Sequence, residues 1–410
     1  MSVTTNSPTT GFDTGEFEEH FDHTSAAHAA NVLDRYRVMQ QHCPVVHSDQ
    51  HGGFWAISKY DTIVKMLRQP DVFASGDGIL IPATPWPVSL VPTESDEPGH
   101  TAYREPFKPF LTPGVVARYE SVVRERTTML IDSFCAEGNA DFLTQFANRL
   151  PAQVVAGFFG FTFDDGDRYY DWVATSMNPP NGDLALARQA GQEQAEFILE
   201  ALARARANPD NTLISAIATH VTNTGTTFSD EECLGMLLAG IGGALETTAS
   251  ALASTIMLLD RFPDVRADLL NDPSLIPNAV EEVLRMESPL HAAGRTVRRD
   301  IDIDGHQLRE GDRVLLMYGA GSYDPEKFSE PEQFSLTRER NPHLAFGHGI
   351  HRCVGAPLAI LELRVALEEI LKRIPDFRVV NAEGPTVHSG TTWGLTQLDI
   401  EFTPQKPTGQ

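Results

Sequence analysis

The sequence predicts an α+β fold that is mainly helical, with one long central helix and small β-sheets. Of its 410 residues, 41% are hydrophobic, which is enough to build a large buried core. Most apolar residues recur at helical spacing, and only a few short runs have the composition of strands. No linker, low-complexity block or internal repeat divides the chain. We therefore expect residues 1–22 to be a flexible tail and residues 23–410 to form a single domain.

Charge and cysteine content exclude several classes of protein. The chain has 32 Lys and Arg against 56 Asp and Glu, a net charge of −24, whereas nucleic-acid binders have the opposite balance. Its four cysteines are widely separated, which is neither a disulfide framework nor a zinc site and suits a reducing compartment. The first residues lack the apolar core of a signal peptide, and no run approaches a membrane span in length. We expect a cytoplasmic protein without a membrane anchor.

The N-terminal third mixes helices with a strand. Residues 26–41 and 60–68 have helical periodicity, and residues 54–58 form an apolar strand between them. Prolines then interrupt residues 73–98, so long regular structure is not expected there. Apolar residues lie between these prolines. They are either a cover over the core or the lid of an apolar pocket.

A helix that begins near Glu97 carries His100 and Arg104, which lie four residues apart and so share one face. Two cationic groups placed in this way suit a carboxylate or a phosphate. Residues 115–138, 142–160, 165–177 and 183–208 predict further helices, most of whose apolar stripes belong to the core.

The longest predicted helix follows Ser229, which starts a capping box with Glu232. No proline interrupts it until Pro263, so about 32 residues can be helical, a length of about 48 Å. Gly242 and Gly243 lie inside it and are followed by an acid and an alcohol, Glu246 and Thr247. Either the glycines permit close helix packing and the acid has a structural partner, or the helix opens here around something small.

Four further segments come before the cysteine loop. Glu282 and Arg285 are three residues apart on a predicted helix and can form an ion pair. Residues 294–300 and 314–317 predict strands. Arg338 then follows Phe334 at a spacing of four.

A lone cysteine, Cys353, lies in the glycine-rich loop 346–355, directly before a helix in which Pro357 suits the first turn. The positive end of that helix favours a thiolate. Most lone cysteines are small buried hydrophobes, and that interpretation remains open from the cysteine alone. A thiolate held against a flat partner is, however, one way in which proteins bind haem iron.

The loop pattern F-x-x-G-x-x-x-C-x-G is complete and resembles that of the cytochrome P-450 monooxygenases, a resemblance that extends from about residue 54 to about residue 398. It implies a P-450 fold around haem b, with Cys353 as the iron ligand. Glu246 and Thr247 occupy the acid and alcohol positions of the oxygen-binding helix. The family's remaining site positions fall on loop residues Phe346, Gly347 and Gly355, propionate ligands His100, Arg104, Arg295 and His351, and a structural clamp of Glu282, Arg285 and Arg338.

The resemblance also implies the reaction: one oxygen atom of O₂ is inserted into an organic substrate, using two electrons from an iron–sulfur ferredoxin with a separate reductase. It is nearest to the soluble bacterial, camphor-hydroxylase-like branch, although Val88 stands where that branch has an aromatic hydroxyl. We expect a small-to-medium apolar substrate, such as a terpenoid or substituted aromatic. The expected pocket residues are Leu80, Trp86, Val88, Leu90, Ala239, Gly242, Gly243, His291, Thr391 and Thr392.

Two alternatives remain open, a peroxide-driven haem-thiolate peroxygenase and a non-catalytic haem sensor or carrier. For the ferredoxin, the sequence predicts a local basic patch around the cysteine loop. Its expected members are Arg104, Lys108, Arg340, Arg352 and Arg364.

Overall fold

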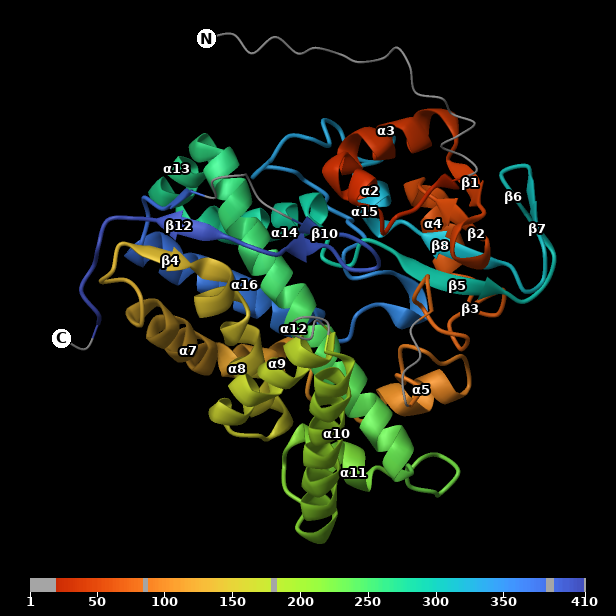
Figure 1. The fold of residues 1–410 in the computed structure, drawn as a ribbon, viewed down its shortest axis with the longest axis horizontal. Coiled ribbons are helices and arrows are strands. Elements are labelled where there is room, and N and C mark those ends of the chain that lie inside the picture. Colours follow the sequence, from red (N-terminus) through yellow and green to blue (C-terminus); the bar gives the residue numbers. More distant parts are fainter. Residues whose placement is uncertain (1–19, 84–87, 178–182, 381–386, 409–410) are drawn as a thin grey trace.

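A computed structural model describes residues 20–83, 88–177, 183–380 and 387–408 (Figure 1). Trp86, which we assigned to the lid, lies outside these described residues. Helices α7 to α11 fill one side of the molecule and a five-stranded sheet the other, and the long helix α12 runs through the middle. The mainly helical α+β fold is confirmed.

Fifteen α-helices are present in the described residues, joined by short 3₁₀ and π turns. They are α2 (Ala26–Ala30), α3 (Val32–His42), α4 (Tyr60–Leu67), α5 (Gly99–Arg104), α6 (Pro113–Val116), α7 (Glu120–Asp132), α8 (Arg149–Phe159), α9 (Phe163–Met177), α10 (Leu184–Ala207), α11 (Leu213–Thr219), α12 (Asp230–Arg261), α13 (Pro263–Asn271), α14 (Ile276–Met286), α15 (Tyr318–Ser322) and α16 (Ala356–Arg373). The short turns are η1 (Gln50–Gly52), η2 (Ala117–Tyr119), the π-turn η3 (Leu143–Ala147), η5 (Pro273–Leu275) and η6 (Gly349–His351).

The main sheet has the strand order β1-β2-β8-β5-β3, in which only the β2–β8 pair is parallel. The smaller sheets are β4-β12-β9, β6-β7 and β10-β11. The strands are β1 (Val45–Ser48), β2 (Phe54–Ile57), β3 (Phe73–Ala74), β4 (Asn139–Asp141), β5 (Ala293–Val297), β6 (Ile301–Ile303), β7 (His306–Leu308), β8 (Arg313–Leu316), β9 (Arg378–Val379), β10 (Val387–His388), β11 (Gly394–Leu395) and β12 (Asp399–Glu401).

Helix α12 has the length and the N-terminus that the sequence predicts. It contains 32 residues, and the backbone N–H of Glu232 donates to Ser229 Oγ while Ser229 N–H donates to the Glu232 carboxylate. By length and composition alone this helix could cross a membrane, so our expectation that no stretch has such a length is wrong. The physical reason for its apolar sequence is burial, because α12 packs against α8, α10, α14 and α16.

The other predicted elements lie near their expected places, with four differences. The helix expected over 115–138 is divided into α6, η2 and α7 and ends at Asp132. The helix expected over 26–41 breaks at Asn31 into α2 and α3, and the helix expected over 142–160 begins as the π-turn η3. The expected tail is too long at its C-terminal end. Phe21 is fully buried against Phe54, and its carbonyl accepts a 2.7 Å hydrogen bond from Ser48 Oγ.

Candidate active site

The cysteine loop is shaped by two glycines and by the helix that follows. Gly347 and Gly349 have φ angles of 63° and 73°, and a Cβ on Gly349 would lie 2.2 Å from the Leu67 carbonyl oxygen, so this position requires glycine. The Cys353 N–H donates to the Phe346 carbonyl at 2.9 Å, which closes the loop. Helix α16 starts three residues after the cysteine, with a proline in its first turn.

The Cys353 side chain is accessible to solvent, whereas the other three cysteines are buried. Protein atoms around the sulfur nevertheless desolvate it, and this desolvation raises the pKa of the thiol. Backbone N–H groups of Gly355 and Ala356 and the charges of Arg104 and Arg352 oppose that rise. The helix N-terminus therefore acts in the predicted direction, against the desolvation of the sulfur.

Cationic and neutral nitrogen donors converge beside this loop. Arg104 Nη1 donates to the backbone carbonyls of Ile350 and Arg352 at 3.0 and 2.8 Å, which ties α5 to the cysteine loop. The rings of His100 and His351 lie 4.2 Å apart between their centroids. Arg295 on β5 is 4% exposed, and the described residues include no carboxylate that pairs with it.

This cluster is short of negative charge. His100 is buried and neither of its ring nitrogens makes a hydrogen bond of normal geometry, although a Glu97 oxygen lies 3.5 Å from Nδ1. Burial and the charges of Arg295, His100 and Arg104 lower the pKa of His351 to about 2, so its ring is neutral. His351 Nε2 is also without a partner. A ligand with carboxylate groups would satisfy these unpaired donors.

One face of α12 is open along its middle. Ala239, Gly242, Gly243, Glu246 and Thr247 recur at helical spacing and are all at least partly exposed, whereas the flanking turns of the helix are buried. A Cβ added to Gly242 or Gly243 would meet no atom within 4 Å. Of the two interpretations of these glycines, open space beside the helix is therefore correct and tight packing is not.

The acid on this face has two partners from the C-terminal part of the chain. Thr392 Oγ1 donates to Glu246 Oε1 at 2.9 Å, and His388 Nε2 lies 3.0 Å from the same oxygen. Burial raises the pKa of Glu246, but the contacts with His388 and Thr392 outweigh it and leave the pKa below its usual value. The neighbouring alcohol, Thr247 Oγ1, donates to the Gly243 carbonyl at 2.7 Å.

Glu282 is the centre of a buried ion-pair cluster. Its carboxylate is 1% exposed and accepts from Arg285 Nε and Arg338 Nε, both at 2.8 Å. Asn341 Nδ2 and the Ser335 backbone N–H each add a hydrogen bond of 2.9 Å to the same carboxylate. Two guanidinium groups sharing one carboxylate fix the segment that leads into the cysteine loop to α14.

The candidate lid lies between β5 and α12. Gly294 N–H donates to the Ile79 carbonyl at 2.7 Å, and a Cβ on Gly235 would lie 2.3 Å from the Ser89 carbonyl oxygen. Leu80, Val88 and Leu90 are partly buried along this segment. These contacts hold the described parts of the irregular apolar segment, residues 73–83 and 88–98, against β5 and α12.

Two of the polar pocket candidates are already engaged. His291 is 6% exposed, its Nδ1 lies 2.9 Å from the Tyr36 hydroxyl, and its ring stacks on Trp393 at 4.6 Å. The Thr391 carbonyl accepts from the backbone N–H of His291. Thr392 uses its hydroxyl on Glu246. His291 is thus part of the core, and the Thr392 hydroxyl is a hydrogen-bond partner of Glu246.

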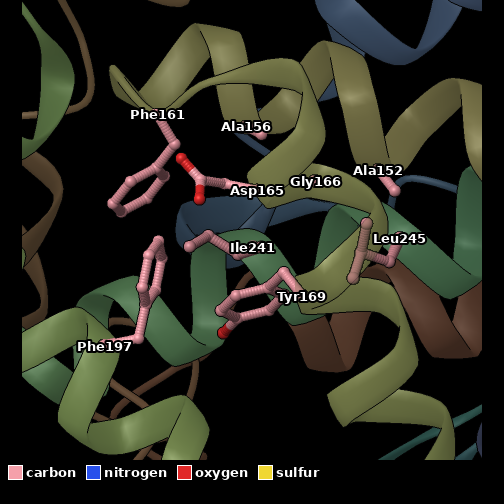
Figure 2. A pocket seen from close by; sticks show the side chains of 9 residues that line it. All are labelled: Ala152, Ala156, Phe161, Asp165, Gly166, Tyr169, Phe197, Ile241 and Leu245. Carbon is pink, nitrogen blue, oxygen red and sulfur yellow. The ribbon is translucent and has the colours of Figure 1, made fainter.

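A second pocket, between α8, α9, α10 and α12, is too small for a substrate (Figure 2). Phe161, Phe197 and Tyr169 face its interior, and the volume open to water-sized molecules is about 10 Å³. Its one carboxylate, Asp165, accepts hydrogen bonds from Thr162 and so has a local structural role.

Sequence reasoning missed His388 and Asn341. Each contacts a predicted site residue from a distant part of the chain. Neither lies in a local motif, so no sequence pattern at hand could have identified it.

The donor set fits haem: a cysteine sulfur for iron, unpaired nitrogen donors for two propionates, and open space beside Gly242 and Gly243. Fold and site together define a haem protein of the thiolate-ligated class. Residues 168–385 match the family model described as Cytochrome P450. The chain belongs to the cytochrome P450 family; like its relatives it is a monooxygenase, and its cofactor is haem b.

Three of the similar proteins come from mycobacteria. The steroid C26-monooxygenase of Mycobacterium tuberculosis is 31% identical over 383 residues, which cover 91% of this chain and 94% of that protein. The methyl-branched lipid omega-hydroxylase of Mycobacterium bovis is 34% identical over 346 residues, 82% of this chain and 80% of that one. A solved Mycobacterium marinum cytochrome P450 in complex with pseudoionone is 26% identical with a TM-score of 0.85, covering 91% and 95% of the two chains.

Proposed function

We propose that this monooxygenase oxidises a small-to-medium apolar compound with O₂ and two electrons from a separate ferredoxin and its reductase, in the cytoplasm. The open face of α12 supports the proposal, because Glu246 and Thr247 lie on it next to the unfilled space at Gly242 and Gly243. The relatives' names refer to a steroid, a methyl-branched lipid and pseudoionone, all dominated by hydrocarbon. A terpenoid or substituted aromatic of similar character fits the apolar lid residues.

The cofactor would activate O₂ and insert one oxygen atom into a C–H bond. Cys353 would supply the thiolate to iron, and His100, Arg104, Arg295 and His351 would hold the propionates. Leu80, Val88 and Leu90 exclude water and bind substrate by burial of apolar surface. Glu246 and Thr247 would pass protons to the oxygen site, since an ionised acid and a hydroxyl lie on one open helix face.

The electron donor would bind where cations surround the cysteine loop. Arg352 and Lys108 are exposed, as are Arg340 and the newly identified Arg68, whose guanidinium lies 3.5 Å from His348. Two predicted members are not free. Arg364 pairs with Glu120 and Glu368, and Arg104 is bound to the loop carbonyls. We therefore limit the proposed patch to Arg68, Lys108, Arg340 and Arg352.

Two measurements test this function. The reduced, carbon-monoxide-bound protein should show the absorbance band of thiolate-ligated haem, and Cys353→Ala should lose it. Turnover of a panel of steroids, branched lipids and terpenoids should require ferredoxin, reductase and reduced nicotinamide. Equal turnover with peroxide alone would instead establish a peroxygenase, and haem binding without turnover of any panel member would favour a sensor or carrier.

A further inference from the structure

A group of three metal-ligating side chains lies away from the haem site, at the N-terminal edge of the domain. Potential ligand atoms of Asp22, His23 and His51 all lie within 4.8 Å of one another in the described part of the chain. Asp22 and His23 precede α2, and His51 lies in η1, the turn between β1 and β2. The proposed monooxygenase reaction uses none of these residues.

Among these three residues, His23 is the one whose ring nitrogens lack hydrogen-bond partners of normal geometry in the described part of the protein. Its side chain is 1% exposed, and neither ring nitrogen makes a hydrogen bond of normal geometry. The backbone of Ile81 is close enough to influence one nitrogen, so at least one of the two lacks any partner. Buried polar groups without partners are rare in folded proteins, and a bound ion is one of the few explanations for them.

The other two side chains are oriented toward the same point and remain reachable from solvent. His51 Nε2 lies 2.9 Å from Asp22 Oδ1, and the two side chains are 21% and 26% exposed. Thr24 donates from its backbone N–H and from its hydroxyl to the same Oδ1, at 2.9 and 2.7 Å. These bonds fix the carboxylate, and Asp22 Oδ2 is left as the oxygen for a ligand bond.

His51 also holds an unusual backbone conformation. Its φ angle is +54°, in the left-handed region that residues other than glycine and asparagine rarely adopt. Its ring stacks on Phe54, with the centroids 6.3 Å apart. The turn thus presents the imidazole toward Asp22 and His23 instead of releasing it to solvent.

We propose that Asp22, His23 and His51 bind one divalent transition-metal ion, with Zn²⁺ the best match and water as the fourth ligand. Two imidazoles and a carboxylate are a donor set that zinc accepts, and three protein ligands leave one position for solvent. Ca²⁺ and Mg²⁺ do not match this site, because these ions favour oxygen donors over imidazole nitrogens.

The ion would join two segments, residues 22–23 and the turn that contains His51. The His23 carbonyl accepts a hydrogen bond from Ser389 Oγ at 3.0 Å. The His23 ring lies near the backbone of Ile81. Ile81 belongs to the candidate lid, and Ser389 precedes Thr391 and Thr392. Metal binding would therefore stabilise the contacts of residues 20–24 with the lid and with the segment of Ser389, independently of the oxidation chemistry.

The test uses the haem-loaded full chain, treated with a chelator, equilibrated with Zn²⁺ and desalted before elemental analysis. We expect about one tightly held Zn²⁺ per chain. His51→Asn should abolish it without disturbing the turn, because asparagine tolerates a positive φ. The matched control is His42→Asn, since His42 is exposed at the end of α3. Zn²⁺ should also raise the thermal unfolding midpoint of the wild type but not of His51→Asn.

A second variant separates metal binding from folding. His23→Phe keeps an aromatic ring in the buried site and removes both unsatisfied nitrogens, so it should fold, lose Zn²⁺ and become insensitive to the chelator. Retention of Zn²⁺ by His23→Phe or His51→Asn would overturn the proposal, and so would failure of the wild type to retain the ion. Loss of Zn²⁺ in the His42→Asn control would place the metal elsewhere and would also overturn it.

Discussion

The carboxylate of Glu246 on the central helix lies 3.0 Å from His388 Nε2 on strand β10, and the Thr392 hydroxyl donates to the same oxygen at 2.9 Å. This relationship connects the open face of α12 to the C-terminal hairpin. Glu246 is 44% exposed and His388 37% exposed, so neither side chain is fully enclosed by protein. The contact between them identifies His388 as a positioning residue for the proposed proton path.

Thr247→Ala should uncouple electron use from product formation. The variant loses a hydroxyl on the open helix face, and loss of a positioned proton donor typically lowers a rate by about 10²-fold or more. We expect reductant to be consumed and hydrogen peroxide to replace most of the product. The measurement is the ratio of product to reductant oxidised. A ratio equal to that of the wild type would contradict the assigned role.

His388→Gln should raise the pKa of Glu246, because His388 is one of the two groups that hold it low. A lowered carboxyl pKa adds stability above its unfolded value near 4.5, and this stability is lost as pH falls through the folded pKa. The difference in unfolding midpoint between wild type and His388→Gln should therefore be largest above pH 5 and shrink below 4.5. The same substitution made in a Glu246→Gln background should have no such pH dependence.

Glu282→Gln should be strongly destabilising. It removes the negative charge that Arg285 and Arg338 share in the interior, and breaking a buried ion pair typically costs about 3–5 kcal/mol. Asn341→Ala removes one hydrogen bond to the same carboxylate and should cost less, about 1.5–3 kcal/mol. Urea unfolding monitored by haem absorbance measures both. Equal effects of the two substitutions would show that Glu282 does not act through its charge.

Glu362 in α16 makes stability depend on pH in the opposite sense to Glu246. Burial raises its pKa to about 8, and its Oε2 has no hydrogen-bond partner. A raised carboxyl pKa favours the folded state below the unfolded value, and this contribution is lost as pH rises from about 4.5 through about 8. Each pKa unit is worth about 1.4 kcal/mol, so the decline should amount to several kcal/mol.

Glu362→Gln should flatten that decline, because the amide does not ionise. Urea unfolding at a series of pH values from 5 to 9 measures it. The control is Glu339→Gln, which changes an exposed residue and should leave the slope of the wild type unaltered. A slope in Glu362→Gln as steep as in the wild type would assign the pH dependence to another group.

Arg352→Glu should slow the first electron transfer from ferredoxin and leave substrate-induced spectral shifts intact. Arg352 is exposed beside the cysteine, and exposed charges are screened over about 8–10 Å at physiological ionic strength. Stopped-flow reduction should therefore also slow steeply as salt rises. Arg204→Glu on α10 is the control, since it changes the net charge equally at an exposed position in another element. Reduction rates that do not change with salt and are equal in the two variants would exclude the proposed basic patch.

Local features of the chain account for much of the site. The capping box at Ser229, the spacing of Glu282 and Arg285, and the loop around Cys353 all depend on residues within one or two turns of each other. Such patterns are readable because helix geometry and loop length place near neighbours at defined distances. The mainly helical fold followed from the same periodicity.

Long-range packing accounts for the rest. His388 meets Glu246, Asn341 meets Glu282 and Arg364 is neutralised by Glu120 only because distant elements pack together. Desolvation of the Cys353 sulfur by surrounding protein likewise opposes the helix N-terminus that its neighbours in sequence predict. Spacing along the chain thus indicated which groups the site contains, while burial and partners distant in sequence set their charge state and availability, because desolvation and ion pairing depend on what lies nearby in space.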